Sequence, residues 1–171
     1  MTLSPVPASV CWTREPWGAA LRCRPLEAIA QHLFTTRQLQ LPSAEAWQTL
    51  APSLGVETDR FLTLNQVHGR EIVAIHRGIE PRALRSLQDH RTDADGFVSG
   101  APDVALVIRV ADCLPVFMAD RRTGVVAAVR VGWRGTAARA AVAAIDMLGR
   151  ECGSRPADLV VAIGPAIGAC C

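Results

Sequence analysis

Seven short apolar segments, each bounded by glycine, proline or aspartate, constrain the fold of this chain more than any other feature. They are rich in valine and isoleucine, as β-strands commonly are. The predicted strands cover residues 61–64, 71–76, 96–99, 104–110, 115–119, 124–131 and 159–163. Several of them follow one another before the long helical segment near residue 140. This order favours an α+β fold, a mixed β-sheet core with flanking helices, over a strict alternation of strands and helices.

Helical periodicity occurs in two places. After Ser43, a residue type that caps helix N-termini, apolar residues recur at helical spacing up to Gly55, a typical C-terminal stop. A second helix is predicted from Thr136, as its N-cap, to about residue 150. Its apolar stripe consists of Ala138, Ala141, Val142, Ile145 and Leu148. Residues 1–30 show no clean period, and we expect an irregular N-terminal lead-in before one domain over residues 31–171.

The composition excludes several classes of protein. Half of the 171 residues are apolar and a fifth are charged, which supports a buried core and argues against intrinsic disorder. The net charge is +2, so neither a nucleic acid nor a membrane surface is an expected partner. All 18 basic residues are arginine and no tyrosine is present, which excludes a Schiff-base lysine, a P-loop lysine and a tyrosine acid.

The six cysteines do not form a zinc-ribbon or redox motif. No two of them are spaced as Cys-x-x-Cys, and a chain of this length and apolar content needs no disulfides. The first residues lack the pattern of a secretory signal, and the most apolar stretch, residues 125–148, contains three arginines. We therefore expect free thiols, a reducing cytoplasmic location and no membrane span.

Four segments carry polar residues or glycines where predicted strands end, and functional sites are often built at such positions. The segments are residues 64–69, 111–115, 129–136 and 164–168. Their polar side chains include Asn65, Gln66, His68, Asp112, Cys113, Arg130 and Arg134. Each segment also has an ordinary structural explanation, such as Trp133 filling the core, so none of them decides the function alone.

Together these segments resemble the YfiH family of laccase domain-containing proteins, described as purine nucleoside phosphorylases and formerly as multicopper polyphenol oxidases. The family pattern is QVHG, ADALV, ADCLPV, HAGWRG and GPAIG. This chain has QVHG at 66–69, ADGFV at 94–98, ADCLPV at 111–116, RVGWRG at 130–135 and GPAIG at 164–168. Such a set is far more specific than one glycine motif. The resemblance covers residues 31–171 and implies the YfiH-like fold, which is related to the cytotoxic necrotizing factor cysteine hydrolases.

The resemblance also implies a metal site. In the family, zinc is held by the histidine of QVHG, the cysteine of ADCLPV and the histidine of HAGWRG, and the first two match His68 and Cys113. Imidazole and thiolate are suitable zinc ligands, and three ligands leave a position open for water or substrate. The implied reaction is attack of phosphate on the sugar carbon of a purine nucleoside. Attack of water on the purine ring gives the adenosine deaminase activity also described in the family, and the older family name implies copper.

The same resemblance implies roles for several polar side chains. His68 and Cys113 are the implied catalytic groups as well as the metal ligands. Arginine binds phosphate through paired N–H donors, which makes Arg37 and Arg134 candidate phosphate contacts. The complete set of candidate substrate contacts is Arg37, Asn65, Gln66, Asp112, Arg130 and Arg134.

Arg130 stands where the family has its third metal ligand. A guanidinium stays protonated and has no lone pair for a metal, so we expect much weaker zinc binding than in the relatives. The family also continues beyond the position of Cys171 with a tyrosine and further elements. We therefore expect residues 31–171 to lack the C-terminal part of the family domain.

Two other functions remain open. Cys113 as a nucleophile activated by His68 would make the protein a metal-independent hydrolase, of which peptidoglycan-precursor editing is one variant. Loss of the third ligand would instead leave an inactive paralogue that keeps the fold. Both enzymatic interpretations require His68 and Cys113 to meet in one pocket. The sequence does not indicate an oligomeric state.

Overall fold

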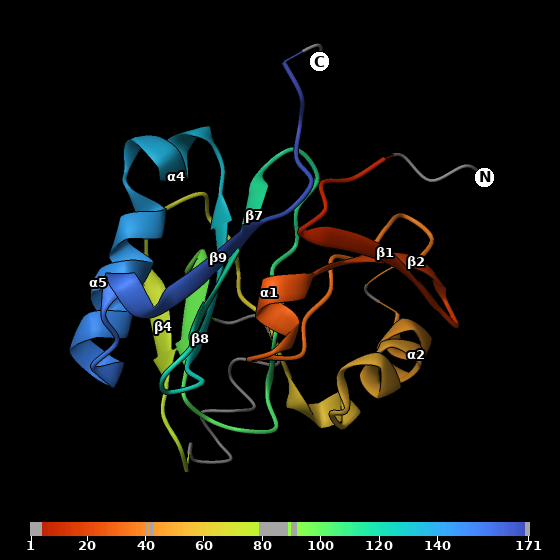
Figure 1. Cartoon of the computed structure of the whole chain (residues 1–171), viewed down its shortest axis with the longest axis horizontal. Helices are drawn as coiled ribbons and strands as arrows, with labels where there is room; N and C mark the ends of the chain where they lie inside the picture. Colours follow the sequence, from red (N-terminus) through yellow and green to blue (C-terminus); the bar gives the residue numbers. More distant parts are fainter. Residues whose placement is uncertain (1–4, 40, 42, 79–88, 90–91, 170–171) are drawn as a thin grey trace.

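A five-stranded mixed sheet forms the centre of the molecule (Figure 1). The computed structural model describes residues 5–39, 41, 43–78, 89 and 92–169. The sheet contains β4 (Ile72–Ile75), β5 (Gly96–Ser99), β7 (Leu114–Asp120), β8 (Val126–Val131) and β9 (Leu159–Ile163). Their order across the sheet is β4-β5-β8-β7-β9. β4 and β5 run parallel, and the other neighbouring strands run antiparallel.

The helix α5 (Ala140–Cys152) covers one face of this sheet (Figure 1). Successive residues of a strand point to opposite faces, so Val129 of β8 and its alternate neighbours point toward the helix. From the helix side, Ala140, Ala144 and Leu148 are spaced one turn apart and have no exposed surface. One apolar core therefore lies between alternate residues of the strands and the residues of α5 that are spaced one turn apart.

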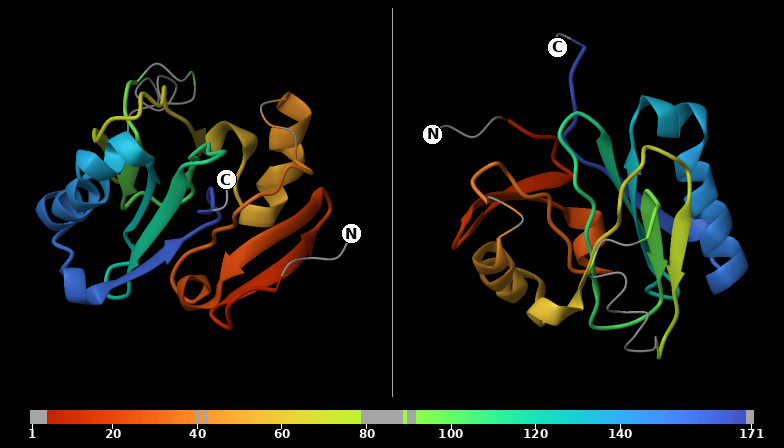
Figure 2. Two further views of the ribbon diagram at one scale, coloured as in Figure 1. Left: turned by 90° about the horizontal axis from the view of Figure 1, so that it is seen from above. Right: turned by 180° about the vertical axis from the view of Figure 1, so that it is seen from behind.

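The opposite face is covered mainly by the N-terminal part of the chain, as Figure 2 shows. This part contains the hairpin of β1 (Val10–Glu15) and β2 (Gly18–Cys23), the helices α1 (Arg24–Glu27) and α2 (Ala44–Leu54), and β3 (Phe61–Leu62). β3 pairs in parallel with β6 (Ala105–Leu106), which comes from later in the chain. Two short helices, η1 (Thr58–Arg60) and η2 (Pro156–Asp158), precede β3 and β9. Leu21 and Phe34 pack in one cluster with Ala119 and Val160 of the sheet, so the hairpin shares its core with the sheet.

The α+β class and the predicted strands are confirmed. The segments 96–99 and 159–163 match β5 and β9, and each of the other five contains or overlaps a strand. The helix after Ser43 is also confirmed, because the Ser43 hydroxyl accepts the Ala46 N–H at 3.1 Å and α2 ends at Gly55 in the left-handed conformation.

The first 30 residues differ from the irregular lead-in that the sequence predicts. As far as this segment is described, β1 and β2 pair along their full length and α1 follows directly. Leu21 and Cys23 are buried, while Arg22 between them pairs with Glu15 at 3.1 Å. This alternation is a strand signal, but it is short and lies among prolines and tryptophans that hide it.

The helix predicted from Thr136 to about residue 150 is divided in two. A short helix, α4 (Trp133–Ala137), begins earlier, and Arg139, with a φ of 62°, separates it from α5. Thr136 lies inside α4, where its hydroxyl donates to the Gly132 carbonyl at 2.9 Å. Thr136 is therefore not an N-cap, and of the predicted apolar stripe Ala141, Val142, Ile145 and Leu148 lie in α5 while Ala138 caps the end of α4.

Within the described ranges, no helix has both the length and the apolar character needed to span a bilayer. The described cysteines are free thiols, in agreement with the expectation for them, and they are Cys11, Cys23, Cys113 and Cys152. The remaining two, Cys170 and Cys171, lie outside the described residues.

His32 is buried between the hairpin and the sheet, and its ring is neutral. Its Nε2 accepts the Cys23 N–H at 2.8 Å, which leaves Nδ1 to donate to the Ala30 carbonyl at 3.1 Å. Burial, aided by the positive charge of Arg22, lowers the pKa of His32 below its ordinary value of 6.5. Protonation would put a hydrogen on the nitrogen that accepts from Cys23, so the folded chain favours the neutral ring.

We expect the free energy of unfolding to decrease as the pH falls below about 6.5, because the unfolded chain then binds a proton that the folded chain accepts only at lower pH. Above this pH the ring is neutral in both states and the stabilisation is complete. Urea midpoints measured between about pH 7.5 and about pH 5.5 test this expectation. In His32→Gln the free energy of unfolding should depend less on pH than in the parent. In the control His76→Gln, at an exposed histidine, this pH dependence should equal that of the parent. An unchanged dependence in His32→Gln would contradict it.

Candidate functional site

His68 and Cys113, which lie far apart in the sequence, meet at Gly132. A Cβ placed on Gly132 would lie 2.7 Å from Cys113 Sγ and 3.7 Å from His68 Cδ2. Gly132 follows β8 and begins the turn into α4, and Cys113 directly precedes the antiparallel strand β7. The sheet therefore brings an imidazole and a thiol from two predicted segments to one point, where only a residue without a side chain leaves them room.

The other two predicted segments pack around the same end of the sheet. The carbonyl of Gly69 lies 3.3 Å from the position of a Cβ on Gly135, so the loop before β4 contacts α4 (Figure 1). The Ile167 N–H donates to the Asp112 carbonyl at 3.1 Å, and the Gly164 N–H donates to the Pro115 carbonyl at 2.9 Å. These backbone contacts hold the glycine-bracketed turn against the segment that carries Cys113.

The carboxylate of Asp95 holds the loop that carries His68. Asp95 has no exposed surface, and its Oδ2 accepts the N–H groups of Val67 at 3.2 Å and Gly69 at 2.6 Å. These two donors flank His68, whose φ of 63° lies in the left-handed region that L-residues other than glycine seldom adopt. A conformation of this kind persists where the surroundings enforce it, and here two hydrogen bonds do so.

Arg130 points inward to the same carboxylate. Its side chain is buried, and its Nε and Nη2 both donate to Asp95 Oδ1, with the Nε bond at 2.8 Å. The Arg130 backbone N–H also donates to the Asp95 carbonyl at 2.7 Å. The position that matches the third metal ligand of the family is thus occupied by a cation in a buried ion pair.

Asn65 and Gln66, predicted as substrate contacts, hold the loop in place with their amide groups. The Asn65 Nδ2 donates to Asp93 Oδ1. The Gln66 side chain binds both backbone groups of Arg109, accepting its N–H at 2.9 Å and donating to its carbonyl at 3.1 Å. Both polar atoms of the Gln66 side chain and the Nδ2 of Asn65 are therefore engaged within the protein.

Arg134 and Trp133 lie on the exposed side of α4. Trp133 has 77 % of its surface exposed, which excludes the alternative structural explanation that it fills the core. The Arg134 guanidinium carbon lies 5.2 Å from the centroid of the Trp133 ring, a cation–π contact that leaves its N–H donors available to an anion. Arg37 is exposed in a turn between Leu33 and Leu39, which pack in a cluster with α2.

The side chains present do not form the zinc or copper site that the family implies. In the parts of the chain that the structure describes, no group of three histidine, cysteine, aspartate or glutamate residues is arranged to hold a metal ion. His68 and Cys113 supply two donors, but Arg130 has no lone pair to give as a third. Both oxygens of Asp95 already accept hydrogen bonds, so this carboxylate is not free to replace the missing ligand.

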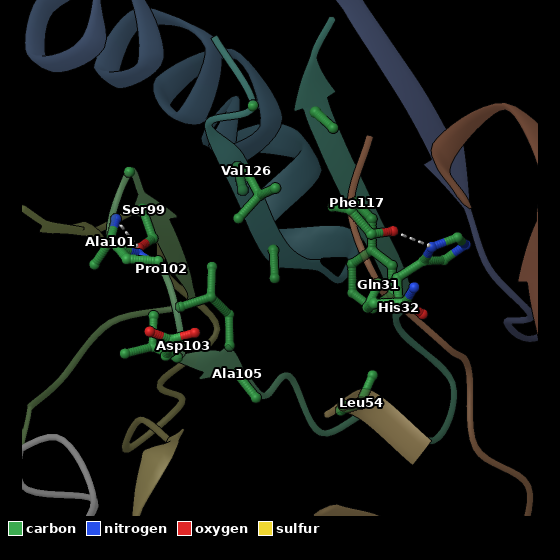
Figure 3. Close-up of a pocket in the computed structure, with 18 of the residues that line it drawn as sticks. Gln31, His32, Leu54, Ser99, Ala101, Pro102, Asp103, Ala105, Phe117 and Val126 are labelled. Atoms are coloured by element: carbon green, nitrogen blue, oxygen red, sulfur yellow. Dashed lines mark hydrogen bonds between the residues drawn. The ribbon is translucent and has the colours of Figure 1, made fainter. Parts of the chain in front are cut away.

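A cavity of about 460 Å³ lies elsewhere, between the sheet and the N-terminal part (Figure 3). His32, Ser99, Phe117 and Val126 are among the residues that line it, and Figure 3 shows the hydrogen bond that His32 makes there. None of the eight predicted site residues lines this cavity. The cavity is therefore separate from the cluster at Gly132.

Asp95 and Gly132 are the two residues of this site to which the sequence analysis assigns no role. Asp95 lies within the ADGFV segment and directly precedes a buried strand, which is the only sequence signal for it. Gly132 is recognisable in RVGWRG as a glycine between a strand and a helix. Asp95 contacts Arg130, and Gly132 lies against Cys113 and His68, and these contacts are known only from the folded structure.

Curated relatives are identical to this chain at about a third of the aligned positions. It is 34% identical over 126 residues to a purine nucleoside phosphorylase of Deinococcus radiodurans, a match covering 74% of this chain and 45% of that protein. It is 31% identical over 122 residues to the purine nucleoside phosphorylase YlmD of Geobacillus stearothermophilus, covering 71% and 44%. An adenosine deaminase from an unknown prokaryotic organism is 28% identical over 123 residues, covering 72% and 47%. The chain spans about half the length of these relatives.

Solved structures show the same fold. The crystal structure of YlmD from Geobacillus stearothermophilus superposes with a TM-score of 0.74 at 26% identity, covering 94% of this chain and 66% of that chain. The structure of the hypothetical protein YfiH from Bacillus licheniformis gives 0.66 at 32% identity, covering 74% and 48%. Residues 40–171 match the family described as multi-copper polyphenol oxidoreductase laccase. Because this match extends over most of the sequence, the chain belongs to the laccase-domain, or YfiH, family.

Proposed function

We propose that this protein is an enzyme of purine nucleoside phosphorolysis and that His68 and Cys113 are its catalytic groups. The observation that supports the proposal is the meeting of these two side chains at Gly132 in a chain whose relatives are named purine nucleoside phosphorylases. The substrates are then a purine nucleoside and inorganic phosphate, and the products are the free base and the sugar phosphate.

In this reaction a phosphate oxygen forms a bond to the C1′ carbon of the sugar while the bond from C1′ to the purine nitrogen breaks. The departing base takes up a proton, which an imidazole can deliver near neutral pH. His68 is exposed and therefore accessible to a substrate, and Cys113 is half-buried beside it. No step is assigned to zinc or copper, because the donor set does not fit either metal.

Arg134 is the proposed phosphate contact. Its guanidinium is exposed on α4, the helix that follows Gly132 directly, and a guanidinium binds phosphate through two parallel N–H bonds. Arg37 lies in the segment that packs with α2 and is the less favoured contact. Asn65 and Gln66 are assigned to positioning of the His68 loop rather than to the substrate.

Base release from inosine or adenosine in the presence of phosphate tests the activity. We expect His68→Ala and Cys113→Ser each to lower kcat/KM by about 10²- to 10⁴-fold, the range typical of a lost acid–base or nucleophilic group. The matched controls His76→Gln and Cys11→Ser, at residues outside the site, should retain the parent rate. Equal loss in the controls, or no base release by the parent, would refute the proposal.

The same assay separates the competing reactions. Base release that continues after phosphate is removed would identify a hydrolase, and release of ammonia from adenosine would identify a deaminase. A protein that binds nucleosides but forms no product under any of these conditions would be an inactive paralogue. Each of these outcomes rejects phosphorolysis when no phosphate-dependent release of base accompanies it.

Gly132→Ala should lower kcat/KM by roughly 10²-fold, because misplacing a reacting group by about 1 Å has costs of this size. The new Cβ would stand 2.7 Å from Cys113 Sγ, closer than such atoms approach, so the sulfur must move. Gly100→Ala is the control, since its Cβ would meet its nearest neighbour, a side-chain atom of Val125, at an ordinary 3.6 Å. Full activity in Gly132→Ala would show that the position of the thiol does not matter.

A further inference from the structure

The position of the third metal ligand and the conformation of the His68 loop are linked through one carboxylate. Asp95 Oδ1 accepts both donors from Arg130, and Asp95 Oδ2 accepts the N–H groups of Val67 and Gly69. All these partners are protein groups, and Asp95 has no exposed surface. The residue that departs from the family pattern is thus the residue that neutralises and orients the anchor of the His68 loop.

A metal ion that joined His68 to Cys113 would fix the relative position of the two loops by coordination. In this chain, hydrogen bonds between protein groups connect the two loops instead. The backbone on both sides of His68 is bound to Asp95, Asp95 is bound to Arg130, and Arg130 lies in the strand that leads to Gly132 and the thiol. The left-handed backbone of His68 therefore has a support that needs no ion.

The charge of Arg130 also opposes a metal ion at this place. A guanidinium keeps its positive charge at any working pH, so a dication at the same position would meet a like charge in a region of low dielectric. Among the described residues, the anion that compensates Arg130 is Asp95, which already forms the ion pair. Asp95 could serve as a third ligand only by breaking that pair, which would leave the buried Arg130 guanidinium without its anion.

We propose that the Arg130–Asp95 ion pair replaces the metal ion of this family, so that His68 is positioned beside Cys113 without a metal. Arg130 is then a positioning residue that acts through Asp95. The inference rests on the proposed function only in taking His68 and Cys113 as the reacting groups, and its test does not depend on turnover.

The first measurement uses the complete chain, stripped with a chelator and then dialysed against zinc chloride. We expect the unfolding temperature to be the same with and without zinc, and any bound zinc to be unchanged by Cys113→Ser. This comparison distinguishes zinc bound at the His68–Cys113 site from zinc bound by other cysteines. One equivalent of zinc that is lost in Cys113→Ser or in His68→Ala would overturn the inference.

The second measurement uses Arg130→His, which restores the family residue. Without zinc this variant leaves Asp95 buried without its cation, and we expect its unfolding temperature to fall by on the order of 10 °C. Zinc should raise that temperature again and bind at about one equivalent, and the further change Cys113→Ser should abolish both effects. A folded Arg130→His protein, verified by circular dichroism, that shows no response to zinc would contradict the assigned role of Arg130.

Turnover measured on the same samples separates this inference from the proposed function. Activity of the parent that survives chelator treatment supports a metal-independent site. Activity that is lost on chelation and restored by zinc would overturn the metal-independent site and leave phosphorolysis standing. Absence of phosphorolysis in every sample would reject the proposed function, while the zinc measurements would still decide the role of Arg130.

Discussion

A carboxylate without exposed surface is stabilised in a protein when hydrogen bonds and an opposite charge replace the water it has lost. Asp95 meets this requirement with the side chain of Arg130 on one oxygen and two backbone N–H groups on the other. Removing one partner of such a pair costs about 3–5 kcal/mol in typical cases, because the remaining charge stays buried. The arrangement of the His68 loop therefore depends on this pair, and the two residues are best considered as one unit.

The sheet makes this pair possible. β5 and β8 are antiparallel neighbours, and the Arg130 N–H donates to the Asp95 carbonyl just beyond the last pair of the strand register. The neighbouring strand β7 starts beside the end of β8, which brings Cys113 to Gly132. The sheet under α5 thus sets the positions of the loops at its end, and hydrogen bonds such as those to Asp95 hold the His68 loop there. The candidate site lies at the strand ends and not in the cavity of about 460 Å³, which lies toward the N-terminal part.

Several features of the site can be inferred from local sequence. QVHG, ADCLPV and RVGWRG each combine reactive or charged side chains with glycine or proline at the end of a predicted strand, and their resemblance to the family pattern identifies His68, Cys113 and Arg130 as candidate site residues. The partners of these residues cannot be inferred in the same way. Asp95 and Arg130 are 35 residues apart, and an ion pair over such a distance depends on strand register, which no local pattern specifies.

Residue type and short-range periodicity are enough to specify the strand segments, the helix between Ser43 and Gly55 and the absence of lysine chemistry, while the resemblance to the family pattern identifies the cation at the third ligand position. The strand and helix segments depend on interactions within a few neighbouring residues. Three others became known only from the folded chain: residues 10–23 form a hairpin over the sheet, Trp133 is exposed, and Arg130 points to Asp95. Each of these depends on which distant segment covers a side chain, and burial is a property of the whole packed chain rather than of any segment.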